Sequence, residues 1–140
     1  MDKKYYVVID TNVVVSSLLK SDSLPGKVLR LCLDGVITPI LNDEIVDEYL
    51  DVLTRNKFDL DEKIVEDTIN SIKEKSIYLD RTETIEDFID KDDVVFYEVA
   101  LTAGVTLTES YLVTGNKRHF PVKPFVVTPR EMLEIINGEK

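Results

Sequence analysis

The first residue in this sequence with the means to do chemistry is Asp10, a carboxylate that directly follows the apolar run Tyr5–Ile9. Burying a carboxylate is costly unless it caps a helix, meets a cation or shifts its pKa. Two interpretations of Asp10 follow. It caps a helix that begins near Asn12, or it belongs to a functional site at the end of a strand.

Glu48 is the second candidate, and it lies in an acidic helix predicted from Asp43 to Arg55. At about 100° per residue, Glu48 lies roughly 120° from the centre of the apolar face of this helix, whereas the other acids of the helix body lie roughly 140–180° away. Glu48 is thus the acid nearest the packed boundary, from which it can reach a neighbouring strand end. The alternative is that Glu48 is one member of a solvated acidic face.

The third candidate is the acidic segment Asp90-Lys91-Asp92-Asp93, which precedes a nearly apolar helix predicted to end at Gly104. A helix that is apolar all round sits between other elements, so its N-terminal acids are carried inward. Capping and the helix dipole explain one of these acids, because both favour negative charge at a helix N-terminus. They are a poor explanation for all three, and we expect at least one acid to be only partly exposed.

The chemistry open to these carboxylates is limited by the rest of the composition. A single cysteine, Cys32, and a single histidine, His119, exclude a cysteine-based zinc site and any motif that needs two histidines. Carboxylate oxygens from three parts of the chain suit a hard divalent cation, Mg²⁺ or Mn²⁺. Such an ion can bridge a phosphodiester and activate a water, so phosphate-ester hydrolysis is the leading reaction class.

A polar segment, Thr114-Gly115-Asn116, comes at the end of another predicted strand. Its hydroxyl, backbone and amide groups can contact a water or a phosphate, and Lys117, Arg118 and Lys123 form a modest basic patch beside it. Taken alone, the segment also fits an ordinary polar turn between a strand and a loop. His119 can touch a phosphate as well, but the sequence shows no partner for it.

Strands and helices alternate along the chain, which predicts an α/β domain around a parallel sheet. In such sheets the ligand site lies outside the carboxyl ends of the strands, so Asp10 and Thr114 are expected at the same edge. The helix over residues 61–75 is expected to bury Ile64, Ile69 and Ile72. Strands are predicted at residues 5–9, 36–40, 77–79, 112–114 and 125–127, and helices at residues 11–20, 25–33, 43–55, 61–75, 92–103 and 130–136.

The chain has 140 residues, with 17 Lys and Arg against 27 Asp and Glu, and a formal net charge of −10. This length predicts one domain over residues 1–140, and the lack of a long apolar run or a signal peptide predicts a cytoplasmic protein without membrane contact. Residues 1–40 carry a net charge of +1, residues 41–93 carry −11 and residues 94–140 carry 0. The acidic total argues against nucleic-acid binding by bulk electrostatics, but not against a local metal site that meets a phosphate.

The order of these motifs resembles the PIN domain family, and within it the VapC-like toxins of toxin–antitoxin systems. The resemblance extends from about Tyr6 to Ile136 and implies a three-layer α/β/α fold with a central parallel sheet. It also implies a metal-dependent ribonuclease that cuts RNA, with an antitoxin protein as partner and a homodimeric assembly. It rests on the segments Ile9-Asp10-Thr11-Asn12-Val13, Glu48-Tyr49, Asp90-Lys91-Asp92-Asp93, Leu112-Val113-Thr114-Gly115-Asn116 and Val127-Thr128-Pro129-Arg130-Glu131.

Matched position by position, the resemblance assigns Asp10, Glu48 and Asp93 as metal ligands, with Asp92 as the alternative if Asp93 is only a cap. The fourth acidic position of the family, usually an aspartate after Thr-Gly, is Asn116 here. An amide can orient a water but brings no charge. Weaker metal binding, one ion in place of two, or loss of activity are the expected consequences.

Four further residues are expected to support these acids or the substrate. The resemblance implies that Asn12 hydrogen-bonds Asp10 and that Thr114 lines the same pocket. Lys117 and Arg118 are the expected contacts for substrate, because they lie beside the polar turn.

Two other function classes stay open. A magnesium-dependent phosphatase domain also places an aspartate after its first strand, but haloacid-dehalogenase-type enzymes need a second aspartate two residues later, where this chain has Asn12. A PIN-like module without catalysis would act by binding protein or RNA, and Asn116 is its best support. Cys32, Tyr49 and Tyr97 are expected to be packing residues.

Overall fold

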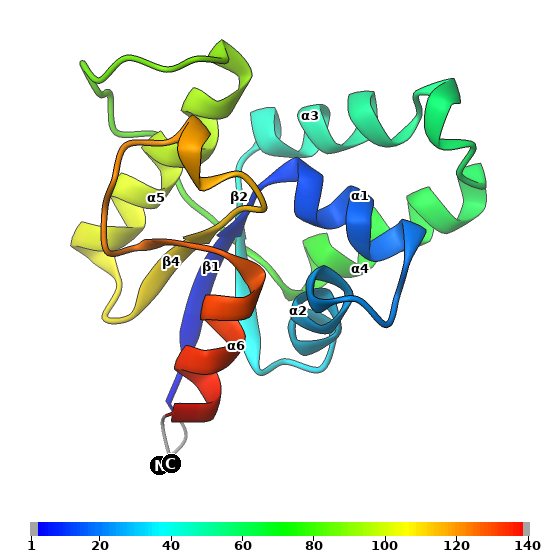
Figure 1. The fold of residues 1–140 in the computed structure, drawn as a ribbon, viewed down its shortest axis with the longest axis horizontal. Coiled ribbons are helices and arrows are strands. Elements are labelled where there is room, and N and C mark those ends of the chain that lie inside the picture. The colour runs from blue at the N-terminus through cyan, green and yellow to red at the C-terminus, as the bar shows by residue number, and fades with distance from the viewer. Residues whose placement is uncertain (1–2, 139–140) are drawn as a thin grey trace.

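The fold is built on a five-stranded parallel sheet with the strand order β3-β2-β1-β4-β5. The structure, a computed structural model, describes residues 3–138 (Figure 1). β1 lies at the centre of the sheet, where it pairs with β2 on one side and β4 on the other. The strands are β1 (Tyr5–Ile9), β2 (Ile37–Leu41), β3 (Ile77–Tyr78), β4 (Ser110–Val113) and β5 (Val126–Val127).

The central strand is buried because it is short, apolar and rich in β-branched residues. Val7, Val8 and Ile9 are at most 1% exposed. A strand covered on both faces needs no alternation of polar and apolar residues, and this one has none. The predicted strand over residues 5–9 is confirmed.

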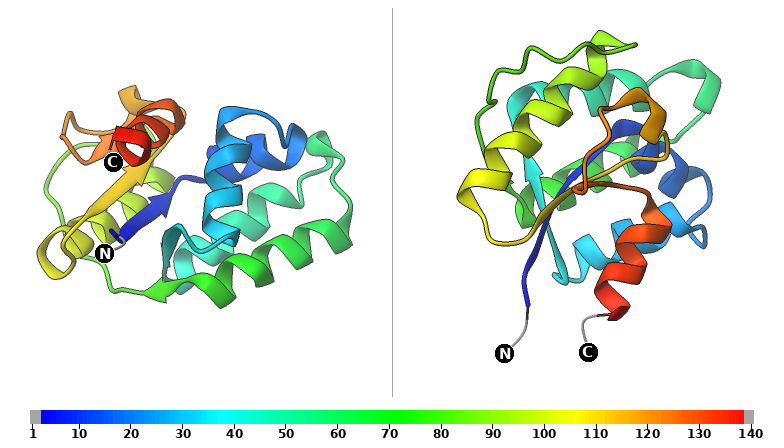
Figure 2. Two further views of the ribbon diagram at one scale, coloured as in Figure 1. Left: turned by 90° about the horizontal axis from the view of Figure 1, so that it is seen from below. Right: turned by 60° about the vertical axis from the view of Figure 1, so that its left-hand side comes forward.

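Helices cover both faces of the sheet, which confirms the predicted three-layer α/β/α fold (Figure 1). α5 lies on one face against β1 and β4, while α2 and α4 lie on the other face against β2. Figure 2 shows from two further sides that the start of β1 and the end of α6 lie at one end of the molecule. The helices are α1 (Thr11–Leu19), α2 (Leu24–Leu33), α3 (Asp43–Leu53), α4 (Glu62–Lys75), α5 (Val94–Thr106) and α6 (Pro129–Gly138).

The ends of α2 and α5 differ in how well they match the prediction. α2 ends at Leu33 as predicted, and Gly35, two residues later, has a φ of 85°, the left-handed conformation that closes a helix. Val36 N then donates to Leu31 O at 2.9 Å, as this kind of helix end requires. The predicted end of α5 at Gly104 is wrong, because that glycine does not adopt a positive φ and the helix continues to Thr106.

Two of the three residues predicted on the apolar face of α4, Ile69 and Ile72, are buried, and Val65 takes the place of Ile64. Val65, Ile69 and Ile72 are buried, at a spacing of four and three residues that places them on one face of a helix. Ile64 is 54% exposed, so its predicted burial is wrong. Within residues 3–138, no helix has the length and apolar character needed to span a membrane.

The residues that follow the strands meet at the carboxyl edge of the sheet, as the prediction of parallel strands requires. Asp10 N donates to Val113 O at 2.9 Å, which ties the end of β1 to the end of β4. Thr114 N donates to Val127 O at 2.9 Å, which adds the end of β5. These backbone contacts place Asp10 and Thr114 side by side although they are far apart in the sequence.

Candidate active site

Asp10 is buried at the carboxyl end of β1, with 4% of the residue exposed. It occupies the N-cap position of α1, but its side chain makes no capping hydrogen bond. Its Oδ2 instead accepts hydrogen bonds from Thr114 Oγ1 at 2.7 Å and from Asn12 Nδ2 at 3.0 Å. The capping interpretation of this carboxylate is therefore wrong.

The neighbours of Asp10 form a connected set of hydrogen bonds across the ends of β1 and β4. Asn12 Oδ1 accepts from Gly115 N at 3.1 Å, and Thr114 Oγ1 accepts from Asn116 N at 3.0 Å. A Cβ at Gly115 would lie 3.3 Å from Asn12 Oδ1, so a glycine suits this close approach. Asn12 and Thr114 therefore hold both the Asp10 carboxylate and the turn that carries Asn116.

Tyr49 of α3 supports the end of β1 from within the core. Its hydroxyl donates to Ile9 O at 2.5 Å, and its ring packs at 6.2 Å from the ring of Phe96. Burial, together with the charge of Asp10, raises the pKa of Tyr49, so the phenol remains a hydrogen-bond donor. Tyr49 is a packing residue, as predicted, and its hydroxyl also hydrogen-bonds the backbone carbonyl of Ile9, the residue before Asp10.

The three acids before α5 have three different environments. Asp90 Oδ1 accepts a hydrogen bond from Asp92 N at 2.9 Å and so caps the short 3₁₀ turn Lys91–Asp93. Asp92 is exposed, whereas only 14% of the Asp93 side chain is exposed. The expectations that one acid is a cap and that at least one is only partly exposed are both confirmed.

Asp93 is close enough to Asp10 to interact with it electrostatically, and one of its oxygens makes no hydrogen bond. Its Oδ2 is buried and has no hydrogen-bond partner among residues 3–138. Burial, and after it the charges of Asp10 and Asp90, raises the pKa of Asp93 to about 6. The pKa of Asp10 is raised too, chiefly by burial, although the hydrogen bond from Thr114 opposes this. Two neighbouring carboxylates with raised pKa values are typical of a functional site.

His119 contacts Asp93 of this pair, a partner that the sequence alone did not predict. Its Nδ1 lies 3.3 Å from Asp93 Oδ2, without the geometry of a hydrogen bond, and its Nε2 lies 3.1 Å from Asn116 Nδ2. The short 3₁₀ turn Lys117–His119 brings the two side chains together, because residues three apart are eclipsed in such a turn. The spacing between Asn116 and His119 was the signal that would have revealed this contact.

Glu48 is the only half-buried acid of α3, as the helical geometry predicted. Burial, and after it the charges of Asp92 and Asp51, raises the pKa of Glu48. It lies at an open pocket of about 170 Å³, whose lining is Glu44, Glu48, Arg81, Lys91, Asp92 and Val95. In the described part of the chain, no three His, Cys, Asp or Glu side chains are arranged to hold a metal ion. The structure thus brings Asp10 and Asp93 together, while Glu48 lies beside Asp92.

The predicted basic patch is partly neutralised by acids. Lys117 Nζ lies 3.1 Å from Glu131 Oε1, and Lys123 Nζ lies 3.5 Å from Glu86 Oε1. Arg118 is exposed in the turn next to Asn116. The patch therefore offers less free positive charge than its composition suggests.

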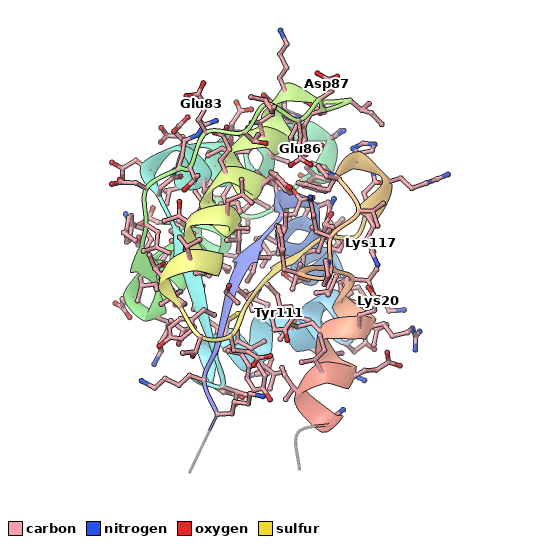
Figure 3. The ribbon with its side chains drawn as sticks, turned by 90° about the vertical axis from the view of Figure 1, so that its left-hand side faces the viewer. Lys20, Glu83, Glu86, Asp87, Tyr111 and Lys117 are labelled. Carbon is pink, nitrogen blue, oxygen red and sulfur yellow. The ribbon has the colours of Figure 1, made fainter. Side chains whose placement is uncertain are left out.

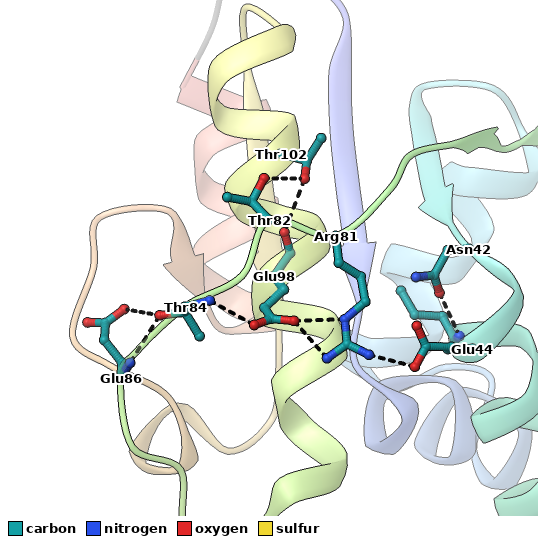
Figure 4. A network of polar contacts seen from close by, with 9 residues as sticks. Asn42, Glu44, Arg81, Thr82, Thr84, Glu86, Glu98 and Thr102 are labelled. Carbon is teal, nitrogen blue, oxygen red and sulfur yellow. Dashed lines mark hydrogen bonds and ion pairs between the residues drawn. The ribbon is translucent and has the colours of Figure 1, made fainter.

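Residues 79–90, here called the strap, run along α5 and are attached to it by a buried glutamate (Figure 4). Arg81 Nε donates to Glu98 Oε1 at 2.7 Å, and Thr84 N donates to Glu98 Oε2 at 2.8 Å. Arg81 also donates to Glu44 Oε2 of α3 at 2.5 Å. No motif or spacing in the sequence predicted a role for these residues. The signal was Glu98, the one charged residue within the apolar sequence of α5.

A family model for the PIN domain matches residues 6–118, which is most of the chain and includes Asp10, Glu48, Asp93 and Asn116. The chain belongs to the PIN domain family. PIN domains are typically nucleases that depend on divalent metal ions. This membership decides against the phosphatase-type alternative. Neither a curated protein nor a solved structure matches the chain.

The donors in this PIN domain fit a hard divalent cation. Asp10 and Asp93 supply two carboxylates that interact electrostatically, and the buried Oδ2 of Asp93 has His119 Nδ1 at 3.3 Å but makes no hydrogen bond within residues 3–138. A cation would compensate the burial that raises both pKa values. Asn116 adds a neutral amide near the same place through its contact with His119.

Proposed function

We propose that this PIN domain is a Mg²⁺- or Mn²⁺-dependent endoribonuclease. The observation that carries the proposal is the carboxylate pair of the buried Asp10 and the half-buried Asp93, in which Asp93 Oδ2 makes no hydrogen bond among the described residues. Asp10 and Asp93 are the proposed metal ligands that lie together, Glu48, which lies beside Asp92, is proposed as the third ligand, and Asn116 completes the catalytic set. A divalent ion at these ligands supplies a Lewis acid that neutralises the phosphodiester and lowers the pKa of a water.

The contribution of the protein is to hold these groups charged and oriented. Thr114 and Asn12 donate to Asp10 Oδ2, and such hydrogen bonds favour the ionised carboxylate. Lys117 and Arg118 are the proposed contacts for RNA phosphates, because both are exposed in the turn that follows Asn116.

The catalytic proposal is tested by cleavage of a short single-stranded RNA in the presence of Mn²⁺. Asp10→Asn and Asp93→Asn are expected to reduce cleavage by about 100-fold or more, because each removes a charged ligand. Asp47→Asn is the matched control, since Asp47 is an exposed acid one residue before Glu48. Equal metal-dependent cleavage by Asp10→Asn and the wild type would contradict the proposed site.

Asn116 favours one alternative, a PIN module that binds RNA or protein without cutting RNA. An amide in place of a carboxylate lowers the charge available to hold a cation. Wild-type protein that binds the same RNA in Mn²⁺ but leaves it uncut, at concentrations where binding is saturated, would support this alternative over the nuclease.

For the biological role we propose the toxin component of a toxin–antitoxin pair, acting in the cytoplasm as a homodimer with an antitoxin protein as partner. The support is the motif resemblance given above, together with the net charge of −11 over residues 41–93, which suits a basic partner segment. Induced expression in a bacterium is expected to arrest growth for the wild type and not for Asp10→Asn. Arrest by both proteins would contradict a toxin that acts by catalysis at this site.

A further inference from the structure

The imidazole of His119 lies between two members of the proposed site. Asn116 Nδ2 is 3.1 Å from its Nε2, and Asp93 Oδ2 is 3.3 Å from its Nδ1. The amide nitrogen of Asn116 carries only hydrogens, so it is the donor and Nε2 is the acceptor. The neutral ring then carries its proton on Nδ1, which is the nitrogen next to Asp93.

Both nitrogen atoms of Asn116 take part in hydrogen bonds. Its backbone N donates to Thr114 Oγ1 at 3.0 Å, and its side-chain nitrogen donates to His119. Its backbone carbonyl accepts from His119 N at 3.0 Å. The side-chain oxygen Oδ1 is the side-chain atom of Asn116 with lone pairs to offer a cation.

We propose that His119 is a positioning residue that holds the Asn116 amide so that Oδ1 serves as a neutral oxygen ligand beside Asp10 and Asp93. His119 does not touch the metal or the substrate in this role. It fixes the rotation of the amide, because only one of the two amide atoms can donate to Nε2. The role rests on the metal-dependent function proposed above.

The hydrogen-bond arrangement is testable in the wild-type protein without metal or activity. His119 is the only histidine of the chain, so the ¹⁵N spectrum of the histidine rings contains one residue. In slightly alkaline buffer we expect a protonated Nδ1 and an unprotonated Nε2. Asn116→Ala should shift the Nε2 signal, since it removes the donor. A ring protonated on Nε2 in the wild type would overturn the proposal.

Three substitutions separate the two contacts of the ring. His119→Ala removes both, His119→Gln keeps an acceptor near the position of Nε2, and His119→Asn keeps only a donor near the position of Nδ1. By titration calorimetry, His119→Ala should bind Mn²⁺ about 10- to 100-fold more weakly than the wild type, the usual effect of removing a group that orients a ligand. His119→Gln should recover most of this loss, and His119→Asn should not.

The controls separate a positioning role from general damage and from failure of the proposed function. Val122→Ala, at a fully exposed position in the following loop, should bind Mn²⁺ like the wild type. Wild-type affinity in a folded His119→Ala protein would overturn the role of His119 while leaving the nuclease proposal in place. Wild-type protein that binds no Mn²⁺ would overturn both. If His119→Ala does not fold, the Mn²⁺ affinities of His119→Gln and His119→Asn are compared in its place. Equal Mn²⁺ affinities of these two variants would overturn the proposal.

Discussion

Asp93 is a partly buried carboxylate, and its raised pKa makes the stability of the folded protein depend on pH. Its pKa in the folded protein is about 6, against an ordinary value of 3.8. The folded state therefore binds this proton more tightly than the unfolded state does. The resulting stabilisation is fully present below about pH 3.8 and is lost as the pH rises through about 6.

Asp93→Asn should remove this pH dependence, because an amide does not titrate in this range. In EDTA and above about pH 6, we expect the variant to melt a few degrees higher than the wild type, roughly 2–6 °C. Thermal unfolding followed by circular dichroism across this pH range measures the difference. A variant that melts at or below the wild-type temperature above pH 6 would show that burial of Asp93 carries no cost.

Asn116→Asp adds a negative charge next to Asp10 and Asp93. Because a cation gains from each added ligand charge, we expect Mn²⁺ to bind on the order of tenfold more tightly. A carboxylate cannot donate to His119 Nε2, so His119→Ala should cost less affinity in the Asn116→Asp background than in the wild type. A double-mutant cycle measured by calorimetry tests this coupling, and additive effects would contradict it.

At the scale of elements, the site depends on how α5 is held, since Asp93 directly precedes this helix. The strap provides one attachment through Arg81 and Glu98, and a second through Glu86, which accepts a hydrogen bond from the buried Tyr97 and pairs with Lys123. Phe88 adds ring contacts to Tyr97 and Phe120 at 5.3 and 6.0 Å. The strap therefore connects the start of α5 to the loop that follows His119.

Arg81→Met should destabilise the protein by about 1–3 kcal/mol, because it leaves the buried carboxylate of Glu98 without its charged partner. This loss of stability is expected to be smaller than for a fully buried ion pair, because 34% of the Arg81 side chain is exposed. Lys63→Met is the control, because it removes an exposed ion pair with Asp67 and should leave stability nearly unchanged. Urea unfolding measures both, and equal effects would argue against a structural role of the strap.

At the scale of the whole molecule, the excess of acid controls how the protein meets RNA. Figure 3 shows Glu83, Glu86 and Asp87 of the strap at the same end of the molecule as the carboxyl edge of the sheet, with Lys117 lower on a neighbouring side. The span of residues 41–93 carries a net charge of −11. Such a surface repels phosphates, so RNA has few cationic contacts near the site.

RNA binding by the wild type should consequently be weak, require Mn²⁺ and fade as salt rises. With about two phosphate contacts, affinity should fall about five- to tenfold between roughly 50 and 200 mM salt. Fluorescence anisotropy with a labelled single-stranded RNA, in Mn²⁺ and in EDTA, measures this. Tight binding in EDTA would contradict a site in which the metal mediates contact with the phosphate.

The sequence by itself determined the parallel α/β architecture and the PIN family, because these depend on local patterns. Apolar runs define strands, and three- and four-residue spacings define helices. Asp10 and Glu48 were located in the same way, from a charge at a strand end and an angle on a helix. The side chain of Glu48 is half-buried as that angle predicted.

Only the tertiary structure decided how these groups are held. It distinguished the half-buried Asp93 from the exposed Asp92, and it gave Asp10 a partner 104 residues away in Thr114. It also placed His119 against Asp93. The physical reason is that burial and hydrogen-bond partners are set by packing between distant segments, which no spacing along the chain encodes.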